Sequence, residues 1–283
     1  MLPAILFFAT SVSAQPIETA AADRTGKPGD DFNLSYALSL FERSKDVENF
    51  ERALNDTTNH VNNLDLDKDG EVDYIRVVDN AEGDAHALVM QVPITDGGMQ
   101  DVAVIELERP GADSAVLQIR GDEDLYGPDK VMEPFEEVPE HTRRAGPAPP
   151  DRFINVGINV WAWPCVRFIY APGYALWVSP WGWHHYPLWW RPWRPLPWRD
   201  YWGWAVRYHR FCRAVLRVHT ARAHNVYVGH RMSSATWQPA PSRPVIAPRP
   251  SGPRGVPSGG GMHRGGIGIG IRGGGGRGGG HHR

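Results

Sequence analysis

Four consecutive runs rich in β-branched residues constrain the fold of this chain more than any other feature. The runs lie at 72–78, 85–94, 101–108 and 114–120. Short turn signals built on Gly, Asp and Pro separate them, at 82–84, 96–98 and 110–113. Strands joined by connections this short pair as antiparallel neighbours, so we predict an antiparallel β meander.

Two short helices are predicted before the meander. Apolar residues recur at three- and four-residue spacing in 34–41 and again in 47–54, and Ser44 is the predicted N-cap of the second helix. The predicted fold class is therefore α+β, with the two helices on one face of the meander. An aromatic-rich irregular and β segment, one basic amphipathic helix and a disordered tail are expected to follow.

Charge divides the chain into two halves. Residues 1–150 carry 30 acidic side chains against 12 basic ones, a net charge of −18. Residues 151–283 carry 2 acidic side chains against 18 arginines, a net charge of +16, and they also hold all twelve Trp and both Cys. Such a split predicts two regions that bind different partners or that bind each other.

Composition also predicts the boundaries along the chain. We expect a signal peptide at 1–14, a mobile leader at 15–30, an acidic calcium-binding α+β domain at 31–138, a linker at 139–150, a Trp/Arg/His-rich basic region at 151–237 and a disordered Pro/Gly/Arg-rich tail at 238–283. The apolar N-terminal run that ends at Val12-Ser13-Ala14 is typical of an export signal. No other stretch reaches the roughly eighteen apolar residues of a spanning helix.

Export has consequences for location and for the cysteines. We expect a periplasmic, secreted or surface-associated protein with no integral membrane span. In an oxidising compartment Cys165 and Cys212 could pair, and two cysteines alone leave that question open.

The segment Asp65-Leu66-Asp67-Lys68-Asp69-Gly70-Glu71-Val72-Asp73 has residue types and spacing that indicate a ligand. Its carboxylates can curl around a hard cation, and Gly70 supplies the sharp turn between them. The segment resembles the loop of EF-hands and of related calcium-binding repeats. That resemblance implies side-chain ligands from Asp65, Asp67 and Asp69, the backbone carbonyl of Glu71, and Asp73 bound directly or through water. Ca²⁺ is therefore the predicted cofactor.

Two departures separate the loop from an EF-hand. Its twelfth position is Arg76 instead of the bidentate Glu, and the residues after it are predicted as strand instead of helix. A second acidic turn at 122–124 offers carboxylates that could complete the shell of the ion. The alternative interpretation is a solvated acidic turn, because Asp and Gly favour turns in any case.

The segment 181–204 reads WGWHHYPLWWRPWRPLPWRDYWGW. It resembles Trp/Pro/Arg-rich membrane-active peptides, which implies contact with anionic lipid at the cell envelope. Trp faces also stack on sugar rings, so a glycan is a second candidate, and a small aromatic core with stacked Arg is the third interpretation. An apolar stripe with interleaved arginines predicts the basic amphipathic helix. The stripe consists of Tyr201, Trp204, Tyr208, Phe211, Val215 and Val218.

No motif in the chain names a reaction. Gly-x-Ser-x-Gly, His-Glu-x-x-His and phosphate-binding Gly loops are absent from the sequence, and the histidines lack the ligand spacing of a structural zinc site. The Arg-Gly-Gly tail looks like that of RNA-binding proteins, but an exported chain is not expected to meet nucleic acid. We therefore predict a non-enzymatic protein, with a hydrolase that uses the carboxylates as a minor alternative.

The whole arrangement is similar to that of uncharacterised secreted bacterial proteins, a resemblance that implies export and the pairing of the two halves. The leading interpretation is an exported calcium-binding protein whose basic aromatic half contacts anionic lipid or glycan of the cell envelope. The alternative is a purely structural protein in which the acidic and basic halves dock on each other.

Overall fold

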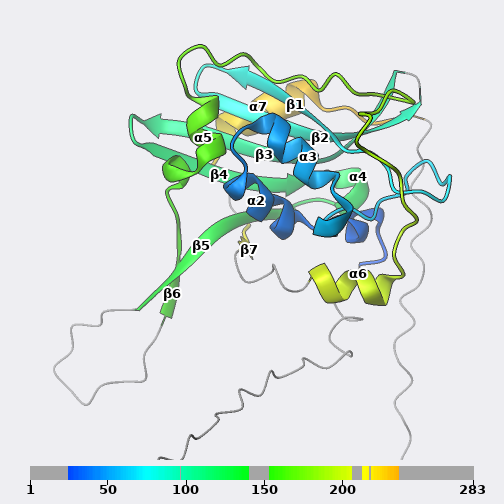
Figure 1. The fold of residues 1–283 in the computed structure, drawn as a ribbon. Coiled ribbons are helices and arrows are strands. Elements are labelled where there is room, and N and C mark those ends of the chain that lie inside the picture. The colour runs from blue at the N-terminus through cyan, green and yellow to red at the C-terminus, as the bar shows by residue number, and fades with distance from the viewer. Residues whose placement is uncertain (1–24, 96, 140–152, 206–211, 217, 236–283) are drawn as a thin grey trace, which may run out of the picture. The chain divides into compact units, whose positions relative to one another are not determined.

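A computed structural model describes residues 25–95, 97–139, 153–205, 212–216 and 218–235, all within one compact unit (Figure 1). Its centre is an antiparallel sheet in the order β1-β2-β3-β4-β5-β6, and β7 also pairs with β5. The strands are β1 (Arg76–Glu82), β2 (Ala85–Thr95), β3 (Gly98–Gly111), β4 (Ser114–Gly121), β5 (Val131–Pro139), β6 (Phe153–Gly157) and β7 (Cys212–Ala214). The predicted meander is confirmed.

The first strand begins later than predicted. Strand β1 starts at Arg76, whereas the sequence predicts a strand from Val72. The backbone N–H of Val72 donates to the carbonyl of Trp193, and that of Asp73 donates to the carbonyl of Leu64. These residues therefore pair with loop segments before the chain enters the sheet.

Two predicted short helices, α2 (Leu34–Arg43) and α3 (Val47–Leu54), cover one face of the sheet together with α5 (Pro164–Ile169). Phe41 and Phe50 pack edge to face with their ring centroids 5.2 Å apart, and Trp163 meets Phe41. The prediction that Ser44 caps α3 is wrong. The side chain of Asp46 accepts from the N–H of Asn49 and caps α3, whereas the Ser44 hydroxyl donates back to the Leu40 carbonyl at the end of α2.

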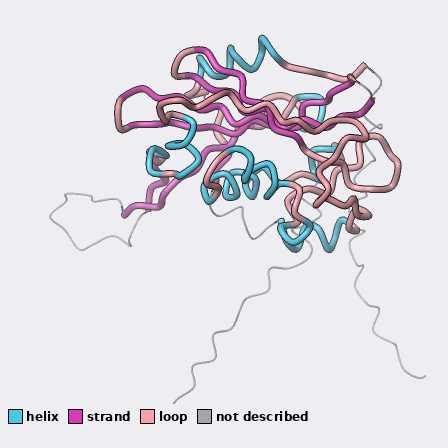
Figure 2. Tube along the Cα trace, turned by 45° about the horizontal axis from the view of Figure 1, so that its top comes forward, coloured by secondary structure: helices cyan, strands magenta, loops and turns pink. Residues whose placement is uncertain are grey.

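Helix α7 (Ala221–His230) covers the opposite face, and Figure 2 shows the sheet between the two layers of helices. Its Val226 and Tyr227 form a second small core with Ala87, Val89 and Val104 of β2 and β3. Because helices cover both faces, β2 and β3 are buried along almost their whole length. Helix α7 had no counterpart among the predicted elements.

The remaining elements are short. They are η1 (Pro28–Asp31), η2 (Thr57–Asn59), α4 (Glu123–Tyr126), η3 (Val160–Ala162) and α6 (Trp198–Ala205). Helix α6 is described as far as Ala205 and holds the start of the predicted basic amphipathic stripe, and Cys212–Ala214 is a strand. The predicted stripe residues Tyr208 and Phe211 lie outside the described residues.

Several predicted features cannot be followed in the described part of the chain. The signal peptide at 1–14, most of the leader, residues 140–152 around the linker and the tail beyond 235 lie outside it. Cys165 and Cys212 are both buried and are not joined to each other, and burial raises the pKa of both thiols. Among the described helices, none combines the length and apolar character needed to cross a bilayer.

Candidate functional site

The acidic loop folds into a tight curl immediately before β1. Asp65, Asp67 and Asp69 each present a carboxylate oxygen within 4.8 Å of the others. The loop is fixed by its own backbone, because the N–H of Asp69 donates to Asp67 Oδ1 at 3.1 Å and the N–H of Gly70 donates to Asp65 Oδ2 at 3.1 Å. Gly70 takes a φ of 90°, a conformation that favours glycine. The predicted Asp cluster is therefore present.

A buried oxygen in this cluster tests whether the residues fit a cation. Asp65 Oδ1 is shielded from solvent and has no hydrogen-bond partner among the described residues. Leaving a buried acceptor unpaired costs about 1–3 kcal/mol. The pKa of Asp67 is raised, first by burial and then by the neighbouring charges of Asp69 and Asp65. Oxygen ligands crowded in this way fit a hard divalent cation.

The other two predicted ligands occupy different surroundings. Asp73 is buried beneath the loop, where its Oδ2 accepts from the N–H of Leu66. Burial, with the charges of Asp67 and Asp65 adding to it, raises the pKa of Asp73 to about 8. Glu71 is exposed, and its N–H donates to Asp69 Oδ1 at 2.8 Å. Ligation by the Glu71 carbonyl and by Asp73 stays a prediction.

The residue at the twelfth loop position is engaged elsewhere. Arg76 Nη2 donates to the carbonyl of Ser179 at 2.9 Å, so its guanidinium bonds to the basic half of the chain. The suggestion that Asp122, Glu123 and Asp124 complete the ion shell is wrong. Within the described part of the chain they do not join the Asp cluster, and all three carboxylates pair with Arg231.

Residues 176–197, which we call the Trp strap, run along the edge of β1 and past the acidic loop. The N–H of Asp79 donates to the carbonyl of Trp177, and the N–H of Ser179 donates to the carbonyl of Val77, so the strap extends the sheet at β1. A 2.7 Å hydrogen bond from the N–H of Val72 to the Trp193 carbonyl joins the strap to the loop.

Between the loop and the strap lies a pocket of about 420 Å³. The loop contributes Asp67, Asp69, Glu71 and Asp73 to it, and the strap contributes Trp183, His184, Tyr186, Leu188, Trp190 and Arg191 among others. Tyr186 and Trp190 stand with their ring centroids 4.7 Å apart. The two features that the sequence presents separately therefore form one site.

Glu51 on α3 holds the strap from inside and was missed by the sequence analysis. Its Oε1 accepts from the hydroxyls of Tyr74 and Ser179, and its Oε2 accepts from the N–H of Val77 and the indole N–H of Trp177. Burial raises the pKa of this carboxyl, although the four donors act in the opposite direction. One sequence signal was available, because position 51 lies on the apolar stripe of α3.

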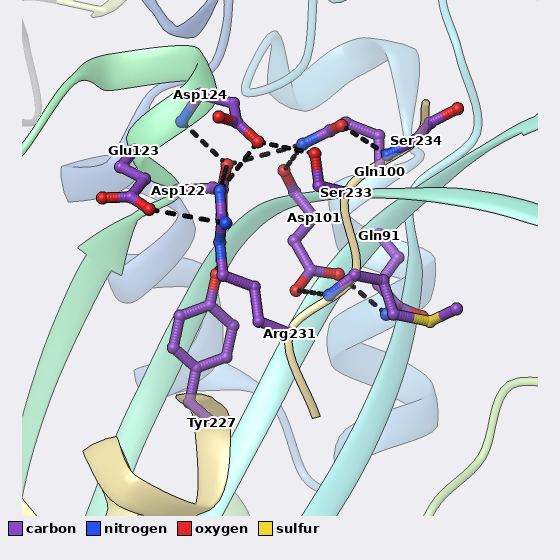
Figure 3. Close-up of polar contacts among 11 residues, drawn as sticks. Gln91, Gln100, Asp101, Asp122, Glu123, Asp124, Tyr227, Arg231, Ser233 and Ser234 are labelled. Carbon is purple, nitrogen blue, oxygen red and sulfur yellow. Dashed lines mark hydrogen bonds and ion pairs between the residues drawn. The ribbon is translucent and has the colours of Figure 1, made fainter. Parts of the chain in front are cut away.

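A second polar cluster joins the end of the described chain, after α7, to side chains of β3 and of the turn that follows β4 (Figure 3). Arg231 Nε bonds to Asp122 Oδ2 at 2.6 Å, and its Nη2 bonds to Asp124 Oδ2 at 2.7 Å. The hydroxyl of Tyr227 donates to the same Asp122 oxygen at 2.8 Å. The hydrogen bond to Asp122, opposed by burial, raises the pKa of Arg231. Asp122 is fully buried, so this is a shielded ion pair.

Asp101 continues this cluster along β3. Its Oδ2 accepts from the N–H of Met232 at 2.9 Å, and its Oδ1 accepts from Gln91 Nε2 at 2.8 Å. Gln100 Oε1 accepts from the N–H of Ser234 (Figure 3). Burial raises the pKa of Asp101 to about 7, against the opposing effect of its two donors.

Three further carboxylates of the sheet bond to side chains of α7 and of the residues before it, and one of them also pairs with Arg120 of β4. Glu106 bonds to Arg120, Thr220 and His224, Glu108 bonds to Arg222, and Glu133 bonds to Arg213 and His219. All three glutamates are buried. Buried carboxylates of the acidic half thus contact basic side chains of the other half, and no local sequence motif signals these pairs.

Comparison with protein-family models, curated proteins and solved structures finds no match to this chain, so the site is interpreted from its own chemistry.

Proposed function

We propose that this chain is an exported, non-enzymatic calcium-binding protein whose Trp strap contacts the cell envelope. The single observation that carries the calcium assignment is the buried Oδ1 of Asp65, which has no hydrogen-bond partner in the described part of the chain and lies within the cluster of Asp65, Asp67 and Asp69. Ca²⁺ takes six to eight oxygen ligands and tolerates flexible geometry. The Glu71 carbonyl and Asp73, directly or through water, are the further ligands we expect.

The ion would act by stabilising the loop and the strap together. It would offset the repulsion among the carboxylates and give Asp65 Oδ1 a partner. We expect an affinity in the weak extracellular range, about 0.1–1 mM. At about 2 mM Ca²⁺ such a site adds roughly 0.7–1.8 kcal/mol to the free energy of unfolding. This magnitude suits a permanent structural ion in an exported protein better than a signalling switch.

Scanning calorimetry of the mature chain in 2 mM CaCl₂ and in EGTA tests the assignment. We expect a higher Tm with Ca²⁺, no such gain in the double variant Asp67→Asn, Asp69→Asn, and a much smaller effect of Mg²⁺, which dehydrates reluctantly. Asparagine keeps the side-chain oxygen that accepts from the loop backbone, so the variant removes charge with little change in the turn. The control is Glu82→Gln with Asp113→Asn, which removes two exposed carboxylates elsewhere.

Two results contradict the calcium assignment. One is a calorimetric titration without heat of Ca²⁺ binding together with a Tm that chelator does not change. The other is an equal loss of the calcium effect in the control variant.

The envelope part of the proposal is supported by what the strap leaves exposed. Leu188 is 91% exposed and Trp189 is 40% exposed. Arg191 and Arg194 of the strap are exposed as well, and so is Arg199 at the start of α6. Apolar and cationic side chains presented together suit anionic lipid or glycan. The alternative, a purely structural role for the basic half, is favoured by the ion pairs of the residues from Arg213 to Arg231.

A further inference from the structure

We propose that the pocket between the acidic loop and residues 183–192 binds a neutral saccharide through the calcium ion. This inference rests on the proposed calcium site and adds to it a class of ligand: a sugar that presents neighbouring hydroxyl groups.

The loop cannot saturate a calcium ion by itself. Three Asp side chains, one carbonyl and Asp73 give about five ligands, whereas Ca²⁺ takes six to eight, so about one to three positions stay with water or with a ligand. An EF-hand closes two of these positions with the carboxylate at its twelfth residue. Here that residue is Arg76, and its guanidinium bonds to the Ser179 carbonyl. Two adjacent sugar hydroxyls are neutral oxygen donors that can take neighbouring positions on the ion.

The walls of the same pocket suit a sugar ring. Trp183, Tyr186 and Trp190 line it together with the carboxylates, within a volume of about 420 Å³ that lies in the usual size range of small-molecule sites. The C–H groups on one face of a pyranose carry partial positive charge and pack against the negative faces of aromatic rings. The ion and the rings would therefore contact one ligand in the same pocket.

Trp190 supplies an independent indication of a ligand. It is only 6% exposed, it lines the pocket, and its indole N–H is buried with no hydrogen-bond partner among the described residues. A buried indole N–H usually finds an acceptor. A sugar hydroxyl that reached this N–H from the pocket, after a shift of the side chains that cover it, would be an acceptor of the required kind.

The charges around the pocket favour a neutral ligand over a phosphate or a carboxylate. Asp67, Asp69, Glu71 and Asp73 face it, and their negative charge exceeds that of one bound Ca²⁺. On the strap side, Arg191 and His184 are the basic side chains of the lining. The five carboxylates of the loop, Asp65 included, carry more charge than one Ca²⁺ and Arg191 together. An anionic headgroup would meet net repulsion here.

The test is a titration of the full chain, followed by tryptophan fluorescence and calorimetry, with mannose and tri-N-acetylglucosamine as probes and choline as a cationic comparator. We expect at least one saccharide to bind in 2 mM CaCl₂ and not in EGTA. Trp183→Ala should weaken that binding about tenfold, equivalent to about 1.4 kcal/mol, without changing the Ca²⁺ isotherm. Trp204→Ala is the matched control, because Trp204 is exposed and stacks on His60 outside the pocket.

Each outcome separates the two proposals. Calcium binding without binding of either saccharide overturns this inference and leaves the calcium site standing, whereas absence of Ca²⁺ binding overturns the proposed function itself. Saccharide binding that persists in EGTA, or that Trp183→Ala leaves unchanged, overturns the inference as well. Binding of choline in competition with Ca²⁺ would replace the sugar site with an aromatic site for organic cations.

Discussion

The basic half of this chain meets the acidic half in two chemically different ways. From Arg213 to Arg231 its arginines pair with the buried carboxylates of Glu108, Glu133 and Asp122, and His224 bonds to Glu106. Along the Trp strap the contacts are backbone hydrogen bonds, aromatic packing and the neutral donors of Trp177 and Ser179 that meet Glu51. The arginines of the C-terminal segment thus form ion pairs that stabilise the fold, whereas the arginines of the strap are exposed at the surface.

The difference tells which arginines are available for a partner. Arg213, Arg222 and Arg231 are parts of ion pairs, so the acidic half already neutralises them. Arg191 and Arg194 lie beside exposed Leu188 and Trp189 and contact no carboxylate within hydrogen-bonding distance among the described residues. Net charge alone does not make this distinction, because it counts both sets equally. Four predictions probe the contrast.

Asp122→Asn should cause the largest loss of stability. The buried carboxylate binds both Arg231 Nε and Nη2, the Tyr227 hydroxyl and Gln100, and an amide nitrogen cannot accept from any of them. Removing one partner of a buried pair typically costs about 3–5 kcal/mol, and we expect about 3 kcal/mol because Arg231 is partly exposed. Urea unfolding measures the change. A loss below about 1 kcal/mol, the range of surface pairs, would show that the pair does not anchor the C-terminal segment.

Glu51→Gln should cost less, about 1 kcal/mol, although Glu51 also has four hydrogen-bond partners. Its partners are neutral, and the hydroxyls of Tyr74 and Ser179 can rotate to accept from the new amide nitrogen. Glu51→Ala, which removes every acceptor, is the comparison and should cost clearly more. Urea unfolding of both variants measures this. If Glu51→Gln lowered the free energy of unfolding as much as Asp122→Asn does, the two regions would not differ in how strongly their buried carboxylates stabilise the fold.

Asp101→Asn should stabilise the protein at pH 8 by about 1–4 kcal/mol, the upper figure being the free energy that a rise in pKa from 3.8 to about 7 represents. The pKa of Asp101 is raised to about 7 in the folded state from its ordinary value of 3.8. The folded state therefore binds more protons than the unfolded state between these values, and stability from this group falls as pH rises through 7. The side-chain oxygen of the new amide still accepts from the N–H of Met232. The side-chain amide of Gln91 can flip so that its oxygen accepts from the new side-chain nitrogen at position 101.

Urea unfolding from pH 5 to pH 8 measures this prediction. The difference between variant and parent should grow with pH and vanish toward pH 4. A variant that is equally destabilised at every pH would mean that the charged form of Asp101 is the one that the fold requires.

Replacing Arg191, Arg194 and Arg199 together by Gln should have the smallest effect on stability, within about 0.5 kcal/mol, because all three are exposed. It should nevertheless weaken binding to anionic vesicles, by roughly 1 kcal/mol per arginine near the surface. Vesicle sedimentation and the blue shift of Trp emission measure the binding. The control triple is Arg43→Gln, Lys45→Gln and Arg167→Gln, which are exposed away from the strap. An equal loss in both triples would exclude the strap as the contact surface.

The sequence determined much of the sheet and part of the site. Three of the four predicted strands match β2, β3 and β4 closely, because β-branched runs and Gly turns encode strands and hairpins locally. The cluster of Asp65, Asp67 and Asp69 was likewise readable, since a loop ligand set lies within a few consecutive residues.

Only the tertiary structure decided what covers the sheet. The alternation of Glu106 and Glu108 with Ile105 and Leu107 is typical of a strand with one face in solvent, and yet α7 and its basic flanks bury these glutamates. The same holds for the pocket, which joins Asp69 to Trp183 across more than a hundred residues. Local patterns fix backbone conformation. Which faces meet depends on long-range pairing of buried charges and rings, for which the chain carries no local signal.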